Sequence, residues 1–114
     1  MNTAEPILEN ILRDLPSGLL SKTGDERVDY YAASAVNETA HTLRNLRLAR
    51  IFQDPGWKAN LSVVIDRLNS VLEATKQSTI AQHESGVAEA VSKLTRSIQQ
   101  LREVEQPATK MAAG

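Results

Sequence analysis

The sequence predicts an all-α fold, namely a helical bundle built on a long antiparallel helical hairpin. Two segments carry apolar residues at helical spacing, and neither residues 25–53 nor residues 57–78 include a glycine or proline. Only residues 54–56 separate the two segments, and so short a joint makes the two helices antiparallel neighbours. The chain has four aromatic residues and no cysteine, so its core must consist of Leu, Ile, Val and Ala, which suits close helix packing.

A short N-terminal helix is expected over about residues 4–15. Thr3 can cap this helix, and Pro16 with Gly18 should end it. Leu19 and Leu20 follow in a connecting segment, where we expect them to cover the core. The apolar face of this helix consists of Ile7, Leu8, Ile11, Leu12 and Leu15.

The first helix of the hairpin is expected over residues 24–53. Thr23 and Glu26 have the T-x-x-E spacing of a capping box, which predicts that the helix begins at Gly24. Small residues on it would let a partner helix approach closely. The predicted apolar stripe consists of Val28, Ala32, Ala35, Val36, Leu43 and Leu46.

The second helix of the hairpin is expected over residues 55–78. Asp54 is a good N-cap and Pro55 is suited to the first helical position. This helix has the strongest apolar face in the chain, formed by Trp57, Leu61, Val64, Ile65, Leu68, Val71 and Leu72.

A last periodic run predicts a C-terminal helix that ends at about Glu105. Its apolar residues are Ile80, Val87, Val91, Leu94, Ile98 and Leu101. This stripe is rotated by about 100° from that of residues 57–72, which favours a break near residues 83–86. The alternative is one helix over residues 55–105, about 75 Å long, which would indicate an assembly.

The chain is long enough for one domain, which we expect over residues 1–105, with a flexible tail over residues 106–114. In the last helix the residues that flank the heptad core are mostly small and neutral. A two-stranded coiled coil normally carries paired charges there. This pattern favours a bundle of three or four helices.

The net charge of −1 is distributed unevenly along the chain. Residues 1–40 carry seven acidic and three basic side chains, whereas Arg44, Arg47, Arg50 and Lys58 cluster around the joint. These four residues are candidates for binding an acidic partner, or a nucleic acid as an alternative. They could equally stabilise the carboxyl end of a helix. The isoelectric point of about 6.1 and the absence of interleaved aromatic residues weigh against nucleic acid.

The aromatic residues suggest one buried and one exposed position. Trp57 shares a stripe with Leu61 and Leu68, so we expect it to plug the end of the bundle, although an exposed Trp57 beside Phe52 would form a binding hot spot. Tyr31 lies nearer the apolar stripe than Tyr30. Tyr30 is therefore a candidate contact residue.

Motifs for chemistry are nearly absent. Glu38 and His41 have the E-x-x-H spacing of di-metal bundles, which makes a metal-binding bundle a second alternative, but the motif occurs once. The sequence contains neither a nucleophile elbow nor a phosphate-binding loop. We therefore expect that the protein is not an enzyme and that it has no catalytic residue, no cofactor and no metal site.

The expected function is that of a non-enzymatic interaction module, such as an adaptor, small chaperone or regulatory subunit. The stripes on residues 57–72 and 87–104 exceed what a short helix and one long helix would cover, which predicts a homodimer or higher oligomer that also binds another protein. No transmembrane or secretory pattern occurs, so we expect a cytoplasmic protein. The residues predicted to form the oligomer or core face are Trp57, Leu61, Ile65, Leu68, Leu72, Val91, Leu94, Ile98 and Leu101.

Overall fold

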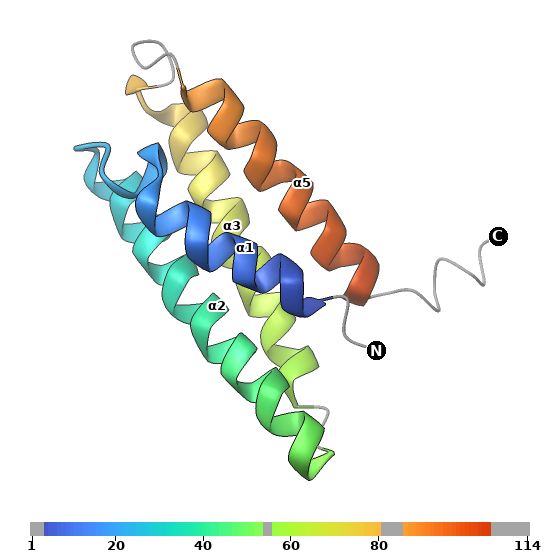
Figure 1. Cartoon of the computed structure of the whole chain (residues 1–114). Coiled ribbons are helices and arrows are strands. Elements are labelled where there is room, and N and C mark those ends of the chain that lie inside the picture. Colours follow the sequence, from blue (N-terminus) through green and yellow to red (C-terminus); the bar gives the residue numbers. More distant parts are fainter. Residues whose placement is uncertain (1–3, 54–55, 81–85, 106–114) are drawn as a thin grey trace, which may run out of the picture.

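The computed structural model describes residues 4–53, 56–80 and 86–105, which form four α-helices and no strand (Figure 1). The all-α prediction is confirmed. The helices are α1 (Ala4–Ser17), α2 (Glu26–Phe52), α3 (Trp57–Gln77) and α5 (Val87–Glu105), and a single 3-10 turn, η1 (Leu19–Ser21), follows α1.

The helices alternate in direction around one core. Residues near the start of α1 contact residues near the end of α2, so the two helices are antiparallel. The contact between α2 and α3 is the most extensive one and confirms the predicted hairpin. Helix α5 packs against α3 and also against α1, which closes the ring (Figure 1). Each helix therefore has two neighbours, as in an up-and-down four-helix bundle.

The predicted apolar faces meet inside this single chain. Leu61 and Leu68 of α3 and Leu101 of α5 are fully buried, and Val91 is half-buried. Apolar residues of α1 and η1 complete the core, namely Leu8, Ile11, Leu15 and Leu20. The stripes on residues 57–72 and 87–104 were expected to exceed what the other two helices would cover, and this argument for an oligomer is wrong. Helix α1 and η1 together cover these stripes within one chain.

The start of α2 differs from the predicted capping box. Asp25 is the N-cap, and its carboxylate accepts hydrogen bonds from the backbone N–H groups of Arg27 and Val28, at 3.0 and 3.3 Å. Asp29 reaches back and accepts from the Thr23 hydroxyl at 2.7 Å and from the Gly24 N–H at 3.1 Å. Gly24 has a φ of 85°, which turns the chain before the helix begins. The helix therefore starts two residues later than predicted.

This cap makes the stability of the protein sensitive to acid. Burial raises the pKa of Asp29, but hydrogen bonds from Thr23 and Gly24 outweigh it, so the pKa lies below its usual value of 3.8. The hydrogen bond from Ser78, followed by that from Val28, also lowers the pKa of Asp25. A carboxyl with a depressed pKa stabilises the folded state above its unfolded pKa, and the contribution disappears as the pH falls through the folded value.

We predict that Asp29→Asn lowers the free energy of unfolding by on the order of 1 kcal/mol at pH 7. The difference from the wild type should shrink as the pH falls through the folded pKa of Asp29, which lies below 3.8, because the wild-type carboxyl is then protonated as well. Urea unfolding at pH 7 and pH 2.5 measures both values. Glu26→Gln in the same turn is the control, because Glu26 is exposed, and it should change little. An equal loss at both pH values would contradict the prediction.

The remaining boundaries shift by a few residues. Helix α1 passes through Pro16 and ends at Ser17, because proline in a last turn removes only one helical hydrogen bond. In the connection Leu20 is buried as expected, whereas Leu19 is 42% exposed. The N-cap of α3 is Gly56, two residues after the predicted cap, and Asp54 and Pro55 lie outside the described residues.

Helices α3 and α5 are separate. The backbone of Ser78 is extended and its N–H bonds to the Thr75 carbonyl at 3.1 Å, which ends α3 at Gln77. The alternative of one helix over residues 55–105 is therefore wrong. Of the predicted break near residues 83–86, Gly86 lies in a turn just before α5, whereas residues 83–85 and the predicted tail over residues 106–114 lie outside the described residues.

Candidate interaction surface

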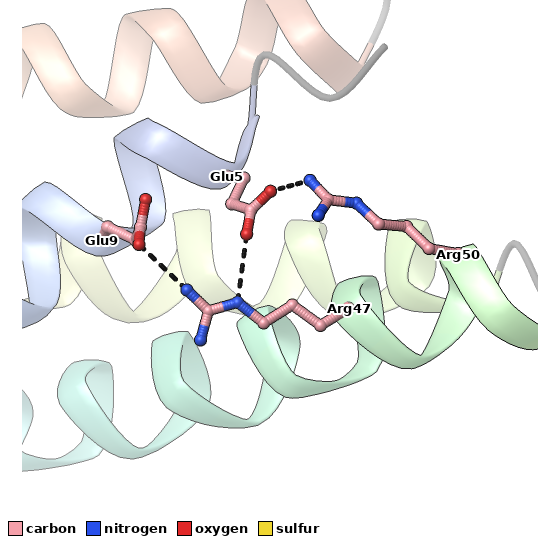
Figure 2. Close-up of polar contacts among 4 residues, drawn as sticks. All are labelled: Glu5, Glu9, Arg47 and Arg50. Atoms are coloured by element: carbon pink, nitrogen blue, oxygen red, sulfur yellow. Dashed lines mark hydrogen bonds and ion pairs between the residues drawn. The ribbon is translucent and has the colours of Figure 1, made fainter.

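Two of the predicted basic residues form an ion-pair cluster with α1. The Arg47 guanidinium lies 3.0 Å from one Glu5 oxygen and 2.9 Å from the Glu9 carboxylate, and Arg50 pairs with the other Glu5 oxygen (Figure 2). The Glu5 side chain is only 16% exposed, so its carboxylate lies between two arginines and is largely shielded from solvent. Arg47 and Arg50 therefore tie α1 to the end of α2.

The other two basic candidates have different surroundings. Arg44 is exposed and makes no ion pair with any residue in the described part of the chain. The Lys58 ammonium lies 5.9 Å from the centre of the Trp57 ring, within range of a cation–π interaction. The predicted ridge is thus divided: Arg47 and Arg50 are paired, whereas Arg44 and Lys58 are exposed and make no ion pair within the described residues.

The tyrosines lie as the helical phase predicted. Tyr30 is 69% exposed, whereas Tyr31 is half-buried against the core. The two rings meet edge to face, with centroids 5.5 Å apart. Tyr30 therefore presents a large aromatic surface near the start of α2.

Three apolar residues at the end of α2 are exposed; sequence reasoning missed Leu48 and Ile51 and considered Phe52 only beside an exposed Trp57. Leu48, Ile51 and Phe52 are 42%, 72% and 71% exposed, whereas Trp57 across the turn is buried. We call Leu48, Ile51 and Phe52 the apolar end of α2. The available signal was their position opposite the buried residues Val28, Ala35 and Leu46 on the helix.

The short length of α1 adds to the exposure of Ile51 and Phe52. Helix α1 has 14 residues and α2 has 27, and the first turn of α1 already pairs with Arg50. The last turn of α2 therefore extends past the described end of α1, and Figure 1 shows this end of α2 projecting from the bundle.

Two shallow hollows flank Leu48. One, of about 370 Å³, lies between Leu12 of α1 and Arg44, Leu48 and Ile51 of α2. The other, of about 340 Å³, includes Phe52 and the edge of Trp57. Their volumes fall within the range of ligand sites, but both hollows are open, and the walls are mostly apolar in the first and about equally polar and apolar in the second. Such a ridge between two hollows suits side chains of a partner protein better than a small polar ligand.

The metal-binding candidates do not gather a ligand set. His41 is exposed, and its Nε2 atom lies 3.3 Å from the side-chain nitrogen of Asn45. Within residues 4–53, 56–80 and 86–105, no three His, Asp or Glu side chains come together in a way that could hold a metal ion.

None of the described helices is long and apolar enough to cross a membrane. Comparison of the chain with protein-family models, with curated proteins and with solved structures gives no match.

Proposed function

We propose that this protein is a non-enzymatic interaction module, an adaptor or regulatory subunit, that binds protein surfaces through the apolar end of α2. The observation that carries the proposal is the exposure of Ile51 and Phe52, both above two thirds, on a helix end beyond the cover of α1. Clustered exposed apolar side chains mark interaction sites on soluble proteins, since burying apolar surface gains about 25 cal/mol per Å².

The ion pairs favour this function over the nucleic-acid alternative. A phosphate that approached Arg47 or Arg50 would have to displace the carboxylate of Glu5 or Glu9. Arg44 and Lys58 alone would supply little of the counterion release that drives nucleic-acid binding. The metal-binding alternative has still less support, because His41 has only an amide beside it.

Native mass spectrometry of untagged protein purified from its own host tests the proposal. We expect the wild-type chain in a complex, with a second copy or with another protein, and we expect Ile51→Glu/Phe52→Ser to free the chain from it. Leu19→Glu is the matched control, because Leu19 is exposed on η1 at the other end of α2, and it should leave the complex intact. A wild-type chain found only as a monomer would overturn the proposal. We expect the protein to work in the cytosol, which suits a chain without cysteine.

A further inference from the structure

The outer face of α2 is a continuous exposed stripe. At 100° per residue, six exposed positions spread over about 21 residues lie within about 40° of one line along the helix. Figure 1 shows α2 at the edge of the bundle, and the buried residues Val28, Ala35 and Leu46 lie on the opposite side of the helix. The six positions are Tyr30, Ala33, Asn37, Arg44, Leu48 and Ile51.

The two ends of this stripe are large and apolar, whereas its middle is polar or small, with Ala33, Asn37 and Arg44. Tyr30 stands near one end, and Leu48 with Ile51 stands at the other. Between them Ala33 and the neighbouring exposed Ala40 would allow a second helix to approach closely. If a second copy of α2 lies antiparallel to the first, with the two-fold axis beside Ala40, then Tyr30 of one copy lies level with Leu48 and Ile51 of the other. The shape therefore suits a copy of itself.

The charge on α2 has the same two-ended character. Residues 26–38 carry three acidic side chains and one basic side chain, whereas residues 39–52 carry three arginines and no acid. Arg47 and Arg50 already pair with Glu5 and Glu9 of α1, so Arg44 leaves one uncompensated positive charge in the second half, against a net charge of −2 on residues 26–38. Two identical helices in opposite directions would place these opposite charges side by side. Arg44, which has no acidic partner in the described residues, would then lie beside Asn37 of the second copy. A parallel pairing would set arginine against arginine.

We propose that the protein forms an antiparallel homodimer through the outer faces of α2, with the two-fold axis beside Ala40. Tyr30 of each copy packs against Leu48 and Ile51 of the other, and the paired faces run for about 32 Å along the helices. This inference rests on the proposed function and names its partner as a second copy of the chain. Such an interface is isologous, because the same patch serves both subunits.

Sedimentation velocity of the purified protein at tens of micromolar tests the dimer. We expect a dimer for the wild type, and we expect Leu48→Arg to weaken it by about tenfold or more, since it places a charge in the contact. Leu19→Arg is matched in exposure, at 42% for both leucines, and should remain dimeric. Far-UV circular dichroism checks that each variant is folded.

Disulfide trapping tests the geometry, because the chain has no cysteine of its own. Ala40→Cys should cross-link with itself at the axis, whereas Ala88→Cys on the exposed face of α5 should not. Tyr30→Cys protein should cross-link with Ile51→Cys protein, and neither should cross-link with itself. If Tyr30→Cys and Ile51→Cys each cross-linked with themselves, the helices would be parallel and the proposed geometry would be wrong.

The outcomes separate this inference from the proposed function. A pure protein that is monomeric, yet occurs with a different protein in its host and loses it on Ile51→Glu/Phe52→Ser, overturns the homodimer and supports the interaction module. A chain that is monomeric in both experiments overturns both. A dimer that Leu48→Arg does not weaken shows that the contact lies elsewhere on the molecule.

Discussion

Replacing Trp57 with alanine is expected to lower the free energy of unfolding by about 3–5 kcal/mol. The side chain is 8% exposed and belongs to the main core cluster, at the end of the bundle where α2 turns into α3. Alanine would leave a cavity there, which the ends of the two helices could fill only by moving out of their packed positions. Urea unfolding followed by far-UV circular dichroism measures the loss, because Trp57 is the only tryptophan and fluorescence disappears with it.

Phe52→Ala is the matched control for this loss. Phe52 is the last residue of α2 and lies on the other side of the same turn, but its side chain is 71% exposed. Its truncation should change the stability of the monomer by no more than about 0.5 kcal/mol. Similar losses for both aromatic residues would mean that Trp57 does not plug the bundle.

Replacing Thr42 with valine is expected to raise the free energy of unfolding, by about 1 kcal/mol or more. Thr42 is fully buried on α2, and its hydroxyl has no hydrogen-bond partner in the described parts of the chain. An unpaired buried hydroxyl costs about 1–3 kcal/mol, and valine keeps the shape of threonine without the polar atom. The two proteins can be compared by their midpoints of urea unfolding.

Thr39→Val is the control that isolates the unpaired hydroxyl. Thr39 is equally buried on the same helix, but its hydroxyl donates to the Ala35 carbonyl at 2.6 Å. Removing a satisfied group should give less stabilisation than Thr42→Val, or none. If both substitutions had the same effect, the gain would come from the preference for valine at a buried site and not from the missing bond.

The buried faces of the helices could be predicted because they depend on local spacing. Leu61, Leu68 and Leu101 recur with the period of the helix, and each is fully buried. A period seen in the sequence survives folding, since a helix keeps the angular order of its own side chains. The same argument placed Tyr30 outside and Trp57 inside.

Local patterns were less able to separate competing caps. Thr23 and Asp25 are both good N-cap residues, and Glu26 and Asp29 are both acids in reach of the chain before α2. The structure uses Asp25 and Asp29, because the left-handed turn at Gly24 directs the chain into a helix that starts at Glu26. That choice depends on a backbone angle that the residue types allow but do not impose.

The character of the arginine cluster depended on contacts between distant residues. Glu5 and Arg50 are 45 positions apart, and Glu9 and Arg47 are 38 apart. Arg47 and Arg50 are bound by α1, whereas Arg44 is not, although all three have the same spacing on one helix. The packing of α1 against α2 makes this distinction, and no pattern within either segment contains it.

The sequence by itself determined that the protein is helical, where its helices lie to within a few residues and which faces they bury, because these properties follow from interactions three or four positions apart. Only the tertiary structure decided which surfaces remain free. Ile51 and Phe52 lie at the end of α2, beyond the pairing of Arg50 with the first turn of α1, and remain exposed there. The core closes within one chain because four helices pack in a ring. Both depend on how segments far apart in the chain pack in space, which local periodicity does not record.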